Sequence, residues 1–146
     1  MLIFMAALFV PAALPCFAAA GGPGDVVSRF CELDFEGHRL SASGYESVKP
    51  LVSYPAEPGW DRVLGIRSDE VGEESIDGSS ARVLVRYEID RFWPDDLEDT
   101  GKYREETFTL SREGDWKINR PIPLPRVSTE LLCREYDNCA AGMPRD

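Results

Sequence analysis

The chain has 146 residues, a length that corresponds to one domain. Its hydrophobic content of 43% and aromatic content of 10% are sufficient for a packed core, which excludes a largely disordered chain. The formal net charge is -10, and residues 1–20 contain no ionisable side chain, so the remainder is distinctly acidic. Nucleic-acid binding is therefore disfavoured, and the negative charge chiefly indicates solubility.

Residues 1–20 are apolar and end in three alanines before Gly21, a pattern typical of signal-peptide cleavage. We therefore expect an exported protein, periplasmic or extracellular. The segment has no Lys or Arg near Met1, so either the true start lies upstream or the signal is atypical. The alternative is an uncleaved membrane anchor, since twenty apolar residues just span a bilayer. Pro11 and Pro15 disfavour that anchor because each interrupts a helix, and Pro15 before Cys16 fits a lipoprotein signal poorly.

Cleavage leaves three cysteines, Cys31, Cys133 and Cys139. We expect Cys133 and Cys139 to form a disulfide in an oxidising compartment, because they are close in sequence. A bridge over this spacing requires the last helix to end between them. Cys31 is predicted to be a buried apolar residue with an unpaired thiol. With a single histidine, His38, and no C-x-x-C motif, the sequence predicts no metal, no cofactor and no Cys/His nucleophile.

Two helices are predicted first. Asp25 is expected to cap a helix that places Val26, Val27, Phe30 and Leu33 toward the core and ends at Gly37. Ser43 and Glu46 have the spacing of a capping box for a second, short helix that runs to about Leu51. Pro55 and Pro58 then favour an extended connection to the first strand.

The longest strictly alternating stretch covers residues 81–93 and predicts a long central strand. Its apolar face contains Val83, Val85, Tyr87 and Ile89. Its polar face contains Arg82, Arg86, Glu88 and Asp90. Because the stretch is about twice as long as a usual strand, it indicates a curved antiparallel sheet.

Three further strands are expected over residues 60–71, 102–112 and 116–119, with a hairpin turn at Asp77 and Gly78. The acidic residues 95–99 form a solvated connection, and residues 121–125 are too proline-rich for an inner strand. Ser128 is placed to cap a last helix. The expected organisation is a signal peptide over 1–20, one α+β domain over 21–139 and a flexible tail over 140–146.

Four runs together resemble the nuclear-transport-factor-2-like (NTF2-like) superfamily over about residues 24–127: V-V-S-R-F-C-E-L-D-F-E-G-H-R-L, P-G-W-D, A-R-V-L-V-R-Y and G-D-W-K-I-N-R-P. The resemblance implies a cone fold, in which a curved sheet of about four strands wraps around two N-terminal helices, with a C-terminal helix and a pocket at the open end. The group includes ketosteroid isomerase, scytalone dehydratase and many non-catalytic modules, so fold alone does not decide activity. No catalytic motif of these enzymes matches residue by residue, so no catalytic residue is assigned.

Six residues are candidates to line the pocket: Tyr45, Trp60, Val85, Tyr87, Phe108 and Trp116. Packing in the core is the simpler interpretation of each, because inward aromatic residues of strands are usually core. Arg39 is a candidate anchor for an anionic ligand group. The competing interpretation is a salt bridge from Arg39 to Asp34 or Glu36.

The leading hypothesis is an exported, non-catalytic module that binds a small apolar ligand or a protein partner. The first alternative is an isomerase, dehydratase or hydrolase that uses a buried acid and a tyrosine. The second is a homodimer formed through the sheet face, or a protein that neutralises a toxin.

Overall fold

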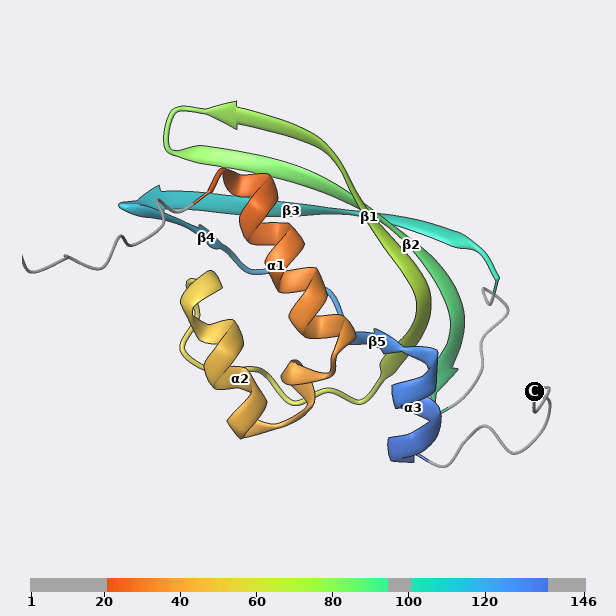
Figure 1. Ribbon diagram of the computed structural model, residues 1–146. Coiled ribbons are helices and arrows are strands. Elements are labelled where there is room, and N and C mark those ends of the chain that lie inside the picture. Colours follow the sequence, from red (N-terminus) through yellow and green to blue (C-terminus); the bar gives the residue numbers. More distant parts are fainter. Residues whose placement is uncertain (1–20, 95–100, 137–146) are drawn as a thin grey trace, which may run out of the picture.

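The computed structural model describes residues 21–94 and 101–136. The expected signal peptide over 1–20, the acidic connection over 95–99, Cys139 and the tail over 140–146 lie outside the described residues. What is described is an α+β fold in which one five-stranded sheet curls around the helices (Figure 1). The predicted fold class is confirmed, and the layout is that of a cone.

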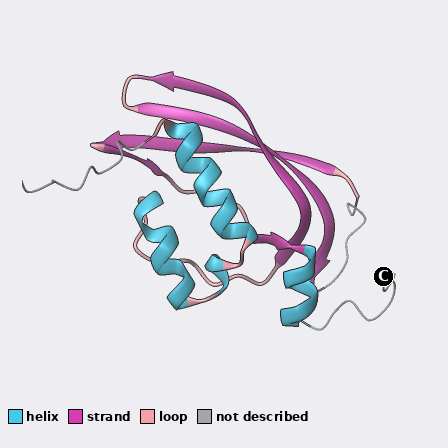
Figure 2. Ribbon diagram, in the orientation of Figure 1, coloured by secondary structure: helices cyan, strands magenta, loops and turns pink. Residues whose placement is uncertain are grey.

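The first helix, α1 (Pro23–Phe35), crosses the concave face of the sheet (Figure 2). Its N-cap is Gly22, not Asp25 as predicted; Asp25 lies one turn inside and accepts a hydrogen bond from the Gly22 N–H at 2.9 Å. The Gly24 N–H donates to the Glu74 carboxylate at 2.6 Å, which places a negative charge at the positive end of the helix. The helix ends at Gly37, whose φ of 84° is the left-handed conformation that glycine tolerates.

A short 3-10 turn, η1 (His38–Leu40), leads to α2 (Ala42–Val48) and then to a second 3-10 turn, η2 (Lys49–Leu51). The cap of α2 is Ser41, whose Oγ accepts from the Gly44 N–H at 3.0 Å, so the predicted cap at Ser43 is wrong by two residues. Ser41 takes this role because its backbone is extended, as an N-cap requires.

The sheet contains β1 (Val63–Asp77), β2 (Ser80–Trp93), β3 (Tyr103–Glu113), β4 (Asp115–Ile118) and β5 (Arg126–Ser128), in the order β4-β3-β2-β1-β5. β1 begins and ends later than predicted, because residues 60–62 remain in the loop that precedes it and its pairing with β2 continues to the hairpin. The first four strands pair antiparallel, and β5 pairs parallel to β1. The fifth strand was not predicted. It forms where the proline-rich segment returns beside β1 and the Leu64 N–H donates to the Pro125 carbonyl at 2.9 Å.

The curvature of the sheet comes from irregular pairing between β1 and β2. The register shifts between Gly65 and Ile66, between Ile66 and Ser68, and between Val71 and Glu74. At each shift, one strand contains an extra residue relative to its partner. Such a residue bends its strand and increases the local twist. The shift between Gly65 and Ile66 places the extra residue on β2. Ile89 and Phe92 are therefore both buried, although residues three positions apart in a regular strand lie on opposite faces.

The core lies between α1 and the concave face of the sheet. Phe30 has no exposed surface and meets the Phe108 ring edge-on, with 5.6 Å between the ring centroids. The last helix, α3 (Thr129–Tyr136), packs on β1 and β2, and its Leu131 N–H donates to the Ser128 Oγ at 3.2 Å, as the predicted cap requires.

Candidate functional site

A pocket of about 600 Å³ opens where η1, α2 and the end of α3 meet the beginning of β1 and the end of β2. Figure 1 shows α2 and α3 at the same end of the molecule, away from the β1–β2 hairpin. The loop over residues 55–60 forms one wall, and its two prolines limit the conformations of this wall. Aromatic rings contribute much of the lining: Tyr45, Trp60, Trp93 and Tyr136.

Arg39 stands behind this pocket at the centre of a buried charge cluster. Its side chain has no exposed surface, and each of its three nitrogens donates a hydrogen bond. Nη1 donates to Asp34 Oδ2 at 2.9 Å, Nε to Glu57 Oε1 at 2.6 Å, and Nη2 to the Pro123 carbonyl at 2.8 Å. The guanidinium therefore joins α1, η1, the 55–60 loop and the proline-rich segment. Of the two partners considered from sequence, Asp34 is the one that Arg39 contacts.

The charge cluster continues to β5. Asp34 Oδ2 also accepts from the Arg126 backbone N–H at 3.2 Å, while Asp34 Oδ1 is buried without a hydrogen-bond partner among the described residues. Burial raises the pKa of the Asp34 carboxyl, against the opposing effects of the Arg39 and Arg126 charges. The Arg126 guanidinium is itself buried and pairs with Glu106 of β3.

Two members of the cluster, Arg39 and Glu57, are among the residues that line the pocket, and Glu57 is the acidic one. Its side chain is 11% exposed, and its Oε1 accepts from Arg39 and also from the Trp60 indole N–H at 3.1 Å. Its second oxygen, Oε2, has no hydrogen-bond partner among the described residues. This oxygen is itself buried, so the carboxylate brings a negative charge to the pocket wall while its unbonded oxygen is covered by neighbouring atoms.

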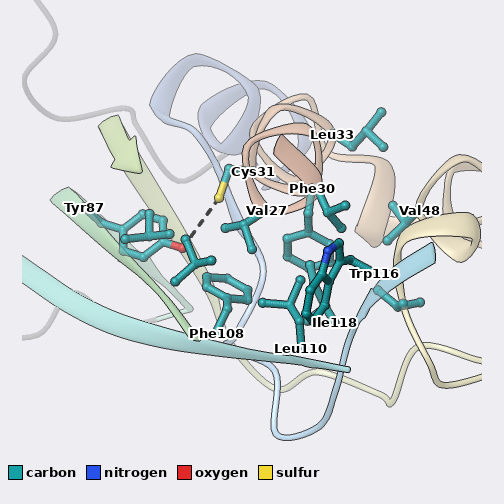
Figure 3. Packing of buried hydrophobic residues seen from close by; sticks show 14 of the residues in the cluster. Val27, Phe30, Cys31, Leu33, Val48, Tyr87, Phe108, Leu110, Trp116 and Ile118 are labelled. Atoms are coloured by element: carbon teal, nitrogen blue, oxygen red, sulfur yellow. Dashed lines mark hydrogen bonds between the residues drawn. The ribbon is translucent and has the colours of Figure 1, made fainter. Parts of the chain in front are cut away.

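A second buried contact lies deeper, between α1 and β2. The Cys31 Sγ is 3.8 Å from the Tyr87 hydroxyl (Figure 3). The Arg126 guanidinium carbon lies 3.8 Å from the centroid of the Tyr87 ring. Burial raises the pKa of the Cys31 thiol to about 12, so the thiol stays protonated at neutral pH. Cys31 is buried with a free thiol, in agreement with its predicted role as a small apolar residue. The bridge between Cys133 and Cys139 stays a prediction, because Cys139 lies outside the described residues.

The six predicted pocket residues separate into two groups. Tyr45 and Trp60 line the pocket; the Tyr45 hydroxyl donates to the Tyr54 carbonyl at 2.9 Å, so Tyr45 is held in place. The other four are buried in the core and are not among the residues that line the pocket: Val85, Tyr87, Phe108 and Trp116. Figure 3 shows Tyr87, Phe108 and Trp116 in this core. The sequence placed all six on inward faces but carried no information on which end of the cone stays open.

The lining residues that were not identified from sequence include Glu57, Trp93 and Tyr136. Trp93 and Tyr136 come from elements that are distant in sequence, and their rings contact each other with 4.5 Å between centroids. A signal was present only for Glu57, which lies between two prolines in a segment otherwise poor in charge.

The arrangement limits the chemistry available to the buried acid. Acid–base catalysis of the isomerase type requires a desolvated carboxyl within hydrogen-bond reach of the substrate or a tyrosine. Asp34 is desolvated, but its bonded oxygen is held by Arg39 and by the Arg126 backbone. Within residues 21–94 and 101–136, no group of three or more His, Cys, Asp or Glu side chains has the arrangement of a metal site. In the same part of the chain, no helix combines the length and apolar character needed to cross a bilayer.

Comparison with known proteins yields little at the sequence level. No family model matches the chain, and no curated protein matches it. Among solved structures, the chain is similar to that of a protein from Campylobacter jejuni described as an NTF2-like transpeptidase. The match has a TM-score of 0.39 and 12% sequence identity, and covers 68% of this chain and 99% of that chain.

Proposed function

We propose that this chain is an exported, non-catalytic cone-fold module that binds a small, largely apolar ligand in the pocket at the open end of the cone. The observation that carries the proposal is the contrast between the two ends of the concave face. Beneath α1 the space is filled by core side chains, whereas the opposite end holds a pocket of about 600 Å³ with aromatic walls. That volume and lining are typical of small-molecule sites.

The pocket is supported from behind in a way that suits binding. The Arg39 cluster ties the 55–60 loop to α1, and the Tyr45 hydroxyl ties α2 to the Tyr54 carbonyl. A wall that is already ordered loses little conformational entropy when a ligand enters. The enzymatic alternative lacks a comparable feature, because the buried carboxyl of Asp34 is engaged by a guanidinium and a backbone N–H.

A neutral apolar fluorophore, N-phenyl-1-naphthylamine, tests the proposal. We expect saturable binding to the folded protein, seen as increased probe fluorescence and altered emission from Trp60 and Trp93. The substitution Gly59→Phe should abolish this binding, because a Cβ at Gly59 meets no atom within 4 Å and the ring is free to occupy the pocket without displacing the backbone.

Thr107→Phe is the matched control. It adds the same ring at an exposed position of β3, where an aromatic residue is compatible with a strand. Both variants should keep the circular dichroism spectrum of the wild type. Equal probe binding by Gly59→Phe and Thr107→Phe, or no binding by the wild type, would refute the proposal.

A further inference from the structure

We infer that the ligand of this pocket is an organic cation, an amine or quaternary ammonium group attached to an apolar body. The inference rests on the proposed function and specifies its ligand class. It depends on three features of the pocket: the charges on its wall, the occupied donors of Arg39, and the aromatic rings around the opening.

The exposed part of the lining is acidic. Glu46 and Glu57 are the carboxylates among the lining residues, and Arg39 is the basic residue among them. The Arg39 side chain has no exposed surface, and its charge is paired with the carboxylates of Asp34 and Glu57. A ligand in the pocket therefore meets carboxylates without meeting an exposed basic side chain from the lining.

The linked ion pairs that begin at the pocket wall, of which Glu106 is 28% exposed, contain more carboxylates than guanidinium groups. Asp34, Glu57 and Glu106 contribute three carboxylates, while Arg39 and Arg126 contribute two guanidinium groups. With the carboxylates ionised, the sum is one negative charge. Glu57 brings this charge to the pocket wall; its Oε2 is buried and has no hydrogen-bond partner among the described residues, so the charge acts on the pocket through space and not through a direct hydrogen bond. A positive group of a ligand would compensate this charge in a partly desolvated place, where electrostatic attraction is stronger than in water.

An anionic ligand has no comparable partner. Each nitrogen of Arg39 already donates, to Asp34, Glu57 and the Pro123 carbonyl. These bonds use three of its five N–H groups, and the side chain has no exposed surface, so an anion could reach Arg39 only if the residues that cover it moved, and it would then approach Glu57, a like charge. The anchor role suggested for Arg39 from sequence therefore requires the cluster to open.

The aromatic rings favour the same class of ligand. A ring attracts a cation placed over its face, and ammonium groups are commonly held by several rings. The Trp60 ring already lies 5.1 Å from the Arg39 guanidinium carbon, so this wall has the geometry for such contacts. Trp93 and Tyr136 form a contacting pair at the opening, and Tyr45 presents its ring while its hydroxyl is bonded elsewhere.

Three naphthalene compounds with the same ring test the inference: 2-naphthylmethylammonium, 2-naphthalenemethanol and 2-naphthoate, a cation, a neutral alcohol and an anion. Each is titrated at pH 7 and low salt against protein loaded with N-phenyl-1-naphthylamine. We expect the cation to displace the probe at a concentration ~10-fold lower than the alcohol, and the anion to be the weakest of the three. Equal displacement by all three compounds, or strongest displacement by the anion, would overturn the inference about the ligand class. The proposed function is tested separately, by whether the probe binds at all.

Two variants locate the charge. Glu57→Gln should reduce the preference for the cation over the alcohol to about 1, with both compounds measured on the variant itself. Because Glu57 also bonds Arg39, this variant can lose stability. Glu46→Gln provides the independent measurement, since the Glu46 side chain is 70% exposed and forms a long ion pair with the Lys49 ammonium, at 3.9 Å. It should lower the preference by ~2-fold. An unchanged preference in both variants would contradict the inference.

Discussion

The substitution Arg39→Met tests whether the buried charge cluster stabilises the fold. Methionine keeps much of the length of arginine but removes the charge and all three hydrogen bonds. Asp34 is then left as a buried carboxylate whose remaining bond is the one from the Arg126 N–H. Breaking a buried ion pair by removing one partner costs about 3–5 kcal/mol. With a urea m-value of about 1.5 kcal/mol/M, that loss lowers the midpoint of unfolding by at least about 2 M.

The pH dependence of this loss has a definite sign. Burial already raises the pKa of Asp34 in the folded protein, and removal of the Arg39 charge raises it further. The folded variant then keeps a proton on Asp34 at pH values where the unfolded chain has lost it. The stabilisation that this protonated carboxyl contributes to the variant is fully present below the unfolded pKa of about 4. It is lost as the pH rises through the folded pKa. The difference between wild type and Arg39→Met should therefore be larger at pH 7.5 than at pH 4.5.

Urea unfolding followed by far-UV circular dichroism, at both pH values, measures these differences. Arg67→Met is the control, because Arg67 also donates to a carboxylate, that of Asp90 at 2.8 Å, but its side chain is 62% exposed. Its midpoint should stay close to that of the wild type, since exposed ion pairs contribute little. The reasoning fails if the two variants have equal midpoints, or if Arg39→Met is least stable relative to wild type at pH 4.5.

A double-mutant cycle isolates the pair itself. Asp34→Asn keeps an oxygen acceptor for Arg39 and removes the carboxylate. In this background, Arg39→Met no longer leaves an unpaired charge at position 34, so it should cost at least about 1 kcal/mol less than in the wild type. Additive costs in the cycle would show that the destabilisation of Arg39→Met arises from lost packing.

Three further substitutions or reactions address the core and the helix ends. Phe30→Ala should lower the free energy of unfolding by about 3–5 kcal/mol in urea melts, because it empties a fully buried ring site against Phe108. Gly37→Ala should lower the melting temperature, since residue 37 has a φ of 84° and a Cβ there would lie 2.4 Å from Leu131 Cδ2; unchanged melting would contradict this. The Cys31 thiol, with its pKa raised to about 12 by burial, should react with 5,5'-dithiobis(2-nitrobenzoate) far more slowly in the native protein than in urea, and equal rates would contradict its burial.

The long central strand was predictable because alternation is a local property. Val83, Val85 and Tyr87 occupy one face in the structure as they do in the sequence pattern, and all are buried. The pattern stops being informative near Asp90, where an extra residue in β2 inverts the faces. A bulge depends on how a partner strand pairs, so the residues of one strand do not reveal it.

The fifth strand and the pocket were not predictable for a related reason. β5 has only three residues and follows a segment whose prolines argue against a strand. It exists because β1 offers free backbone groups beside it, a condition set by the rest of the fold. The aromatic pair of Trp93 and Tyr136 likewise forms only once α3 has packed on the sheet.

The charge cluster connects the stability of the fold to the ligand proposed for the pocket. Asp34, Arg39 and Glu57 come from three separate segments, so the cluster can form only when these segments are assembled. One carboxylate beyond the number of guanidinium groups leaves the folded state with a charge that a bound cation would compensate. A cation that binds only the folded chain stabilises it by mass action, by about 2.7 kcal/mol at a concentration 100 times its Kd. An anion or a neutral compound of the same shape would bring only its apolar contacts. In the proposed complex, the cluster that holds the pocket wall in place would therefore also distinguish among ligands of equal size.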